Sequence, residues 1–340
     1  MINRIAKQIK SRRCLGVMLF IVGIVAGVIA FLLFIETNRA ADELKKDQSQ
    51  NVTACAYIVD NTLNDVISDL DYFRTSPDLF RFISYPDHAN YSVLAQLFSS
   101  FVEKKKYLQL RYISPQGQEM LRVDYIEPRT QVISRLQNKQ HRDYFKKTMR
   151  LSPGQIHYSP VDLNQEYGAV VRPHQPVLRM ATPVYDANNT LWGMLIINLD
   201  ADQLIAQLQQ TCADNNRILL FDHQGSIIYD STRTLDDGIA QNLAPSMQQL
   251  FPDAWPMMRQ NNAQFISDQW LWSWHAIDLE NLEPDRGRLL LASLLPEERF
   301  TAPYSGDYIA IVSLGAILLG LWVYIMACLR AGILKRIPKS

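Results

Sequence analysis

The sequence lacks the residue patterns by which a catalytic or metal site is usually recognised. Its histidines are too widely spaced to share a metal ion, since the nearest pair is sixteen residues apart. The six positions are His88, His141, His157, His174, His223 and His275. No G-x-S-x-G, P-loop, H-E-x-x-H or EF-hand motif is present. We therefore expect a protein without enzymatic activity, cofactor or metal ion.

Cysteine is also scarce, with four residues in a chain of 340. Cys14 and Cys328 fall in long apolar runs, which leaves Cys55 and Cys212 in the region between these runs. An oxidising compartment would allow a disulfide between Cys55 and Cys212, and two buried free thiols explain the pattern equally well. The sequence leaves this choice open.

Acidic residues are missing from both ends of the chain. Residues 1–13 carry five bases and residues 330–340 carry four, with no Asp or Glu in either tail. The whole chain has 34 basic and 34 acidic residues, so without these nine bases the middle region has 25 against 34, a net charge of −9. An acidic region of this kind argues against a nucleic-acid partner, which would require a basic surface.

Two long runs are apolar and contain no charged residue. Residues 14–35 form a run of 22 and residues 309–329 a run of 21, and each is long enough to cross a hydrocarbon core of about 30 Å as a helix. The basic tails predict that both termini are cytoplasmic and that the region between the runs lies outside. The first run exceeds the roughly 7–15 apolar residues of a cleaved signal peptide, so we interpret it as an uncleaved anchor.

A long helix is expected after the first run, because apolar residues recur there at steps of three and four. These residues are Val52, Cys55, Val59, Leu63, Val66, Leu70 and Phe73. Neither Pro nor Gly interrupts the chain between Ile35 and Ser76, and Pro77 is expected to end the helix. The apolar face would pack on a core or, with a repeat near 3.5 residues, on a second copy of itself in a homodimer. A second helix is expected over residues 91–105.

Strand patterns follow, and their order is repeated. Two hairpins are predicted, each with a Gln-Gly turn between apolar strands. Their strands are 107–114 with 118–125, and 217–222 with 226–230. Two further strands follow each hairpin, at 177–185 and 192–200, and at 264–277 and 288–295. With a helix over 201–210 between the halves, this order predicts two related antiparallel-sheet domains in tandem, divided near 211–215.

Four segments in this order resemble a known family. They are LQLRYISPQGQEMLRVDY, LQNKQHRDYF, GQIHYSPVDLN and VLRMATPVYDANNTLWGMLIINLD. Together they resemble the membrane-distal half of double Cache (tandem PAS-like) sensor domains, and the clear resemblance covers residues 107–200. Such domains form the periplasmic parts of bacterial histidine kinases, diguanylate cyclases and chemoreceptors. The resemblance implies that a small ligand binds between the distal sheet and the loops and helix that cover it.

Arginines and tyrosines are the candidate ligand-binding residues, because a guanidinium can hold a carboxylate or phosphate through two parallel hydrogen bonds. Arg142 and Tyr144, in HRDYF, stand where many relatives have an arginine–aromatic motif for the ligand carboxylate. The complete candidate set is Arg142, Tyr144, Arg111, Arg122, Arg179, Tyr158, Asp162 and Asn164. As an alternative, Arg111 and Arg122 are solvated strand residues or pair with Glu119 or Asp124.

One departure from the family pattern concerns the ligand. Amino-acid-binding relatives carry an aspartate for the ligand amine near the end of the last distal strand, and Asn198 stands there in this chain. The Trp-Tyr pair of the amino-acid motif is also replaced by Tyr144-Phe145. The resemblance therefore leaves a carboxylate, a sugar-like ligand or a periplasmic protein partner open.

These observations predict an α+β protein, with a long N-terminal helix and two tandem PAS-like antiparallel-sheet domains between two transmembrane helices. The expected segments are a cytoplasmic tail (1–13), a first span (14–35), a stalk or core helix (36–90), a distal ligand-binding domain (91–210), a proximal domain (211–307), a second span (308–329) and a second cytoplasmic tail (330–340).

The expected function is that of a sensor in the bacterial inner membrane with a periplasmic central domain. A small anionic or polar ligand is expected in the distal domain, and a homodimer is a further expectation. The tail after the second run is too short for a kinase or cyclase domain, so the signal is expected to reach a cytoplasmic or membrane partner. The alternatives are a module that docks a periplasmic binding protein, and the sensor half of a separated histidine kinase or diguanylate cyclase.

Overall fold

A computed structural model describes most of the chain. The described residues are 2–105, 107–212, 216–232, 246–258, 263–279, 288–301 and 314–325. The chain divides into two compact units, of which one comprises Gln48–Leu295 and the other the two terminal regions Met1–Asp47 and Pro296–Ser340. The first of these units contains both sheets and is the one that matters for the site.

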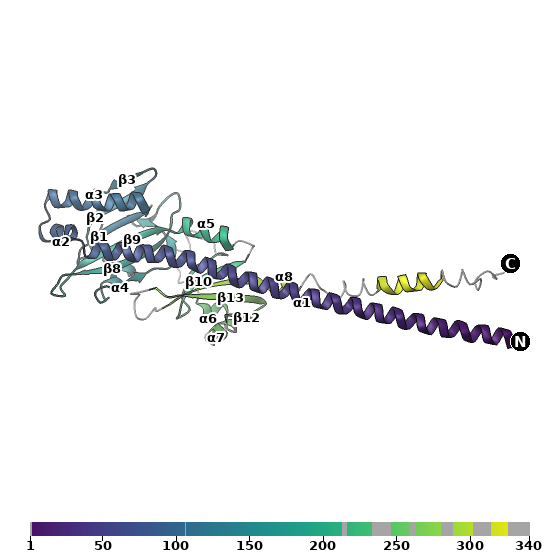
Figure 1. The fold of residues 1–340 in the computed structure, drawn as a ribbon. Helices are drawn as coiled ribbons and strands as arrows, with labels where there is room; N and C mark the ends of the chain where they lie inside the picture. Colours follow the sequence, from purple (N-terminus) through teal and green to yellow (C-terminus); the bar gives the residue numbers. More distant parts are fainter. Residues whose placement is uncertain are drawn as a thin grey trace. The chain divides into compact units, whose positions relative to one another are not determined.

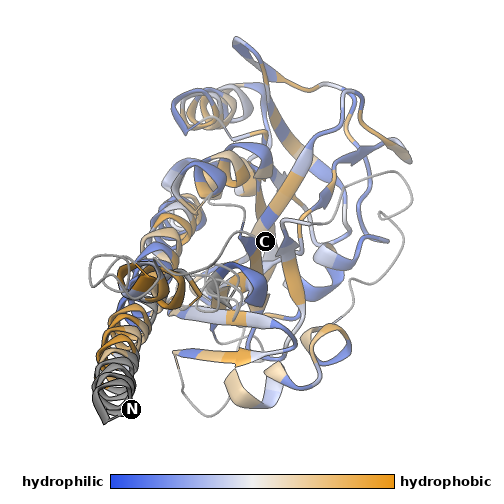
Figure 2. Cartoon of the chain, turned by 90° about the vertical axis from the view of Figure 1, so that its right-hand side faces the viewer, coloured by the Kyte–Doolittle hydropathy of each residue, from blue (hydrophilic) through white to orange (hydrophobic). Residues whose placement is uncertain are grey.

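Helix α1 (Ile2–Arg74) is continuous and is the longest element (Figure 1). It contains the first apolar run, and within the described residues it is the one helix long and apolar enough to cross a membrane. Side chains of this run are exposed, among them Phe20, Ile24 and Phe31, which are 51–70 % accessible, and Figure 2 colours the stretch as hydrophobic. A lipid-facing helix has this kind of surface.

The second apolar run is described only over Leu314–Ile325, which is an apolar helix shorter than a membrane span. The remaining residues of 309–329 and the tail 330–340 lie outside the described residues. The second span therefore stays a prediction.

Beyond the first run, α1 forms one wall of the main hydrophobic core. All seven residues of the predicted apolar face are buried, none more than 2 % exposed. The core interpretation of this face is thus confirmed, and the face packs within its own chain, so it is not free to form the seam of a homodimer. Figure 1 shows α1 running along the folded unit.

Two shorter helices follow α1. It ends at Arg74, where Ser76 caps α2 (Pro77–Ser84) by accepting a hydrogen bond from the Asp78 backbone N–H, and Pro77 occupies the first turn. The stop predicted at Pro77 is therefore confirmed, although α2 itself was not expected. Helix α3 (His88–Lys105) corresponds to the helix predicted over 91–105.

The first sheet has seven strands in the order β3-β2-β1-β9-β8-β4, with β5 also paired to β8. Its strands are β1 (Gln109–Ile113), β2 (Glu119–Ile126), β3 (Arg129–Val132), β4 (His157–Tyr158), β5 (Asp162–Leu163), β8 (Pro176–Tyr185) and β9 (Leu191–Asp200). A separate two-stranded hairpin, β6 (Gln165–Glu166) and β7 (Ala169–Val170), and the short helix α4 (Asp143–Thr148) lie in the same half of the chain.

The second sheet has five strands in the order β11-β10-β14-β13-β12. Its strands are β10 (Arg217–Asp222), β11 (Ile227–Asp230), β12 (Gln264–Ser267), β13 (Trp270–Ile277) and β14 (Leu289–Pro296). Helices α5 (Ala201–Cys212), α6 (Met247–Leu250) and α7 (Ala254–Met258) belong to the same unit, and α8 (Glu297–Thr301) belongs to the unit formed by the terminal regions. The prediction of one strand over 264–277 is wrong, because Asp268 and Gln269 both have positive φ and form a hairpin turn, which Asp-Gln does not signal as Asp-Gly would.

The two sheets repeat one design, as the sequence predicts. Gly117 and Gly225 stand in equivalent hairpin turns, with φ of 81° and 87°. The Gly117 carbonyl accepts a 2.7 Å hydrogen bond from the Lys139 backbone N–H, and the Gly225 carbonyl accepts one of the same length from Met247 at the same sequence spacing. The long helix and the antiparallel sheets are thus confirmed. Both sheets lie in the compact unit Gln48–Leu295. The division into two domains near residues 211–215 therefore stays a prediction.

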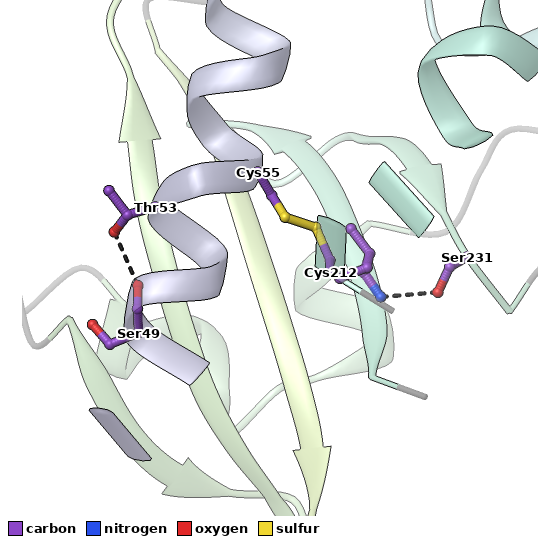
Figure 3. Close-up of a disulfide and its surroundings, with 6 residues drawn as sticks. Ser49, Thr53, Cys55, Cys212 and Ser231 are labelled. Carbon is purple, nitrogen blue, oxygen red and sulfur yellow. Dashed lines mark hydrogen bonds between the residues drawn. A yellow bond between two sulfur atoms is a disulfide. The ribbon is translucent and has the colours of Figure 1, made fainter. Parts of the chain in front are cut away.

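A disulfide joins the first helix to the helix between the sheets. Cys55 of α1 and Cys212 of α5 are bonded, 157 residues apart in sequence and 6.4 Å apart at Cα (Figure 3). The structure therefore decides between the two interpretations of these cysteines that the sequence leaves open.

Candidate functional site

The two faces of the first sheet differ in chemistry. Side chains alternate along each strand, and on one face Leu110, Tyr112 and Val123 pack into the core against α1. Their neighbours Arg111 and Arg122 therefore point to the other face. That face carries a cluster of buried charged and polar groups, although strand interiors normally bury apolar side chains. Such a cluster is stable only if its members satisfy one another.

The cluster is arranged in two rows across the strands. In the first row, Gln109 of β1 lies opposite Asp124 of β2 on one side and Asn198 of β9 on the other. Asn198 in turn lies opposite Arg179 of β8. In the second row, Arg111 is paired with Arg122. All six side chains belong to residues no more than 8 % exposed.

Glu166, at the tip of the β6–β7 hairpin, lies at the centre of the cluster. Its Oε2 accepts hydrogen bonds from Arg122 Nη1 at 2.7 Å, Lys139 Nζ at 3.0 Å and Gln137 Nε2 at 2.5 Å. Its Oε1 accepts from Gln109 Nε2 at 3.1 Å and Arg111 Nη2 at 3.2 Å. One carboxylate thus receives five donors from the sheet and the loop after it.

Two further carboxylates complete the charge balance. Asp124 accepts a bidentate pair of hydrogen bonds from Arg122, from Nε at 2.7 Å and from Nη2 at 2.6 Å. The fully buried Glu119 lies 3.5 Å from Arg111 Nη1 and 3.9 Å from Lys139 Nζ. Three cations, Arg111, Arg122 and Lys139, therefore face three carboxylates. The alternative pairing of the two arginines with Glu119 and Asp124 is present in the structure.

The ionisation of Glu166 follows from these neighbours. Burial by itself raises the pKa of Glu166, but the charges of Arg111, Arg122 and Lys139 outweigh burial and lower this pKa to about 2. Burial and the nearby Arg111 lower the pKa of Lys139, against the opposing effects of Glu166 and Glu119. These neighbours therefore strongly favour the ionised form of the Glu166 carboxylate.

Tyr144 and two further arginines adjoin the cluster. Arg111 Nη1 lies 3.5 Å from Tyr144 Oη, and the guanidinium groups of Arg142 and Arg179 lie 5.8 and 5.7 Å from the Tyr144 ring centre. Arg142 donates to Gln165 Oε1 of the β6–β7 hairpin at 2.9 Å, and Arg179 forms an ion pair with Asp162. Five of the predicted residues thus lie together with Asp162 on this face of the sheet.

The other two predicted residues are placed differently. Tyr158 lies in the main hydrophobic core with α1 rather than among the arginines. Asn164 stands at the base of the β6–β7 hairpin, where its backbone N–H donates to the Gln175 carbonyl and its own carbonyl accepts from the Val171 N–H. A direct ligand contact by any of the eight residues stays a prediction.

Some buried polar atoms of the site have no hydrogen-bond partner within the described part of the chain. Arg111 Nε is one unused donor, and Asn198 Oδ1 is one unused acceptor. Asn198 is fully buried, and its Nδ2 donates to Gln109 Oε1 at 2.7 Å. Because buried polar atoms are nearly always paired, such atoms mark a position where a ligand or water would bind.

Sequence reasoning missed two charged residues of the cluster, Lys139 and Glu166, and the two amide donors to Glu166, Gln109 and Gln137. Lys139 lies in the segment LQNKQHRDYF, in which Arg142 and Tyr144 were the predicted ligand-binding residues. Glu166 is followed by Tyr167-Gly168, both with positive φ, so a tight turn presents it. In the sequence, Gly168 two residues after Glu166 was the one indication of a turn that could present this carboxylate.

The long entry helix and the two antiparallel sheets are the architecture of a sensor domain, as comparison with known proteins shows. The chain matches the family described as bacterial histidine kinase, sensor domain, over residues 59–283. Because this match covers well over half of the chain, the protein belongs to that family.

Solved structures share the fold. The extracellular domain of the putative histidine kinase vpHK1S-Z8 is 23 % identical with a TM-score of 0.58, over 79 % of this chain and 95 % of that one. A domain of a putative sensory box/GGDEF family protein from Vibrio parahaemolyticus is 24 % identical with a TM-score of 0.60, over 78 % and 99 %. The ligand-binding domain of the Campylobacter jejuni chemoreceptor Tlp3, solved with L-valine, is 10 % identical with a TM-score of 0.51, over 78 % and 97 %. A comparison with curated protein sequences finds no match.

Proposed function

We propose that this protein senses a small carboxylate, which binds on the buried charged face of the first sheet. The observation that carries the proposal is the convergence of Arg111, Arg122 and Lys139 on a single carboxylate. Charge-assisted hydrogen bonds of this kind are roughly twice as strong as those between neutral groups. The geometry is therefore suited to an anionic ligand of small size.

The roles of the side chains follow from their positions. Arg111 and Arg122 hold the carboxylate of the ligand, and Tyr144 forms the wall of the site between Arg142 and Arg179. Asp162 keeps Arg179 in place through their ion pair. Asn164 acts through the base of the hairpin, and Tyr158 through the core beneath the sheet.

The carboxylate that binds is proposed to lack an amine. The Campylobacter jejuni receptor binds L-valine in one solved structure and 4-methylisoleucine in another. An ammonium group gains most from a carboxylate partner in a buried site. Here the acceptor is the neutral Asn198, and Asp162 is already paired with Arg179. A simple carboxylic or hydroxy acid therefore fits better than an amino acid.

The signal is proposed to cross the inner membrane through two spans, with both termini in the cytoplasm and a partner protein as the output. The continuity of α1 from the apolar run to the core supports a rigid connection. In the unit formed by the terminal regions, Gly320 lies so close to Val22 that an added Cβ would clash with the Val22 side chain. Close approach at a glycine is typical of helices packed within a membrane.

Thermal unfolding of the full chain in nanodiscs tests the binding proposal. Sodium propionate and sodium lactate should raise the melting temperature relative to sodium chloride at equal ionic strength. A ligand at a hundredfold excess over its dissociation constant stabilises by about 2.7 kcal/mol, which is easily detected. Arg122→Lys keeps the charge, but an ammonium group lacks the planar guanidinium that holds Asp124 with two donors and presents a third to the ligand carboxylate. It should therefore weaken binding about tenfold or more.

The matched control is Arg129→Lys, because Arg129 is an exposed arginine on β3 of the same sheet. It should bind as the wild type does. If no carboxylate raises the melting temperature of any of the three proteins, the proposed function is wrong.

A further inference from the structure

We infer that Glu166 is an internal competitor of the ligand: its carboxylate occupies the position of the ligand carboxylate, and binding releases the β6–β7 hairpin. This inference rests on the proposed function, and it adds the regulation and the charge class of the ligand. The exchange is between two carboxylates in one site, with no covalent step.

The hairpin is attached to the domain mainly by polar contacts. Among the described residues, its two strands pair with each other, Gln165 with Val170 and Glu166 with Ala169, and not with the seven-stranded sheet. All six residues 165–170 are described, and none of them belongs to a hydrophobic core cluster. An element with few buried apolar contacts opens at low free-energy cost compared with global unfolding.

The Glu166 side chain is the main attachment. Gln165 also holds the hairpin by accepting from Arg142. Tyr167 contributes a backbone N–H that donates to Gln137 Oε1 at 2.9 Å, a hydroxyl that donates to the Arg135 carbonyl at 2.7 Å, and a ring that lies 4.3 Å from the Arg135 guanidinium. Tyr167 is 48 % exposed, whereas the Glu166 side chain is 8 % exposed. A surface hairpin thus inserts a single charged group into the buried site.

The charge balance shows what the replacement must be. With Glu166 in place, three cations face three carboxylates and the cluster is neutral. Without Glu166, Arg111, Arg122 and Lys139 face only Glu119 and Asp124, which leaves one positive charge unpaired in a buried position. A ligand with one carboxylate restores neutrality among these five groups. The ligand class is therefore a small monocarboxylate.

The internal carboxylate also sets the sensitivity of the sensor. For a site that is open only for a fraction of the time, the apparent dissociation constant is the intrinsic one divided by that fraction. Removing the carboxylate from the hairpin should therefore tighten ligand binding. We expect the dissociation constant for propionate to fall by roughly tenfold or more in Glu166→Gln and Glu166→Ala.

Isothermal titration of the full chain in nanodiscs with sodium propionate measures this change, with sodium chloride as the blank. Glu103→Gln serves as the control, because Glu103 is an exposed glutamate on α3. Hydrogen exchange of residues 164–171 in the wild-type protein adds a measurement that requires no variant. Propionate should increase exchange in this segment, since the hairpin is released, whereas a ligand normally protects the segment that contacts it.

Four outcomes separate the hypotheses. Tighter binding in both Glu166 variants, together with faster exchange in the wild type, supports the inference. Equal affinity in wild type and variants overturns the inference and leaves the proposed function intact. Weaker binding in the variants also overturns it, because Glu166 would then contact the ligand. If none of the proteins binds propionate, both the inference and the proposed function fail, and Glu166 is a structural ion-pair partner only.

Discussion

Arg111 and Arg122 are directly opposed across the β1–β2 pair, although both carry a positive charge. Like charges in this position normally destabilise a sheet. Here the carboxylate of Glu166 lies between them, 3.2 Å from Arg111 Nη2 and 2.7 Å from Arg122 Nη1. The negative charge of Glu166, a residue from outside the seven-stranded sheet, therefore offsets the repulsion between the two opposed arginines.

Replacing Arg122 should cost more than replacing a surface arginine. Arg122→Met removes the partner of Asp124 and one partner of Glu166, so buried carboxylates lose their counter-charge. Breaking a buried ion pair in this way costs about 3–5 kcal/mol. Chemical unfolding of the full chain measures the free energy of unfolding, and Arg129→Met should change it by less than about 0.5 kcal/mol. Equal effects of the two substitutions would show that the buried pairs contribute nothing to stability.

Acid should weaken the folded state through Glu166. The folded protein lowers the pKa of Glu166 from 4.5 to about 2, so its ionised form stabilises the fold above pH 4.5. This contribution is at most about 3 kcal/mol and is lost as the pH falls from 4.5 through 2. Unfolding titrations between pH 5 and pH 2 should show a shallower decline for Glu166→Gln than for the wild type. Parallel curves for the two proteins would mean that Glu166 does not carry this dependence.

The sequence predicted the elements whose apolar residues recur periodically, and it did not predict contacts made by irregular segments. The apolar face of α1 and the repeated hairpins follow from spacing alone, because burial imposes steps of three and four on a helix and of two on a strand. Arg111 and Arg122 could be placed on facing strands for the same reason. Glu166 and Lys139 come from irregular segments, and their meeting depends on long-range folding that no local pattern encodes. The turn at Asp268-Gln269 was missed because it lacks a glycine.

The disulfide should stabilise the unit that contains both sheets. Cys55 and Cys212 are 157 residues apart in sequence, so breaking the bond raises the conformational entropy of the unfolded chain. The double variant Cys55→Ser/Cys212→Ser should lose about 2–4 kcal/mol and melt at a lower temperature. Cys14→Ser, which leaves the bond intact, is the control. Reducing agent should lower the melting temperature of the control and leave that of the double variant unchanged; a reductant effect on both would assign the loss to another cause.

The last prediction concerns the choice between a simple acid and an amino acid. Asn198 is fully buried beside Gln109 and Arg179, and its Oδ1 has no hydrogen-bond partner within the described residues. Asn198→Asp adds a buried negative charge, so the ligand-free variant should unfold at a lower temperature than the wild type. The ammonium group of L-alanine would compensate this charge, whereas propionate, which lacks only that group, would not.

L-alanine should therefore raise the melting temperature of Asn198→Asp more than propionate does, and the wild type should show the reverse order. Asn188→Asp is the matched control, because Asn188 lies in an exposed turn between β8 and β9. It should follow the wild type with both ligands. The same order of ligands in all three proteins would show that position 198 does not select between them, and the amine would then have to be recognised, or excluded, by another part of the charged face.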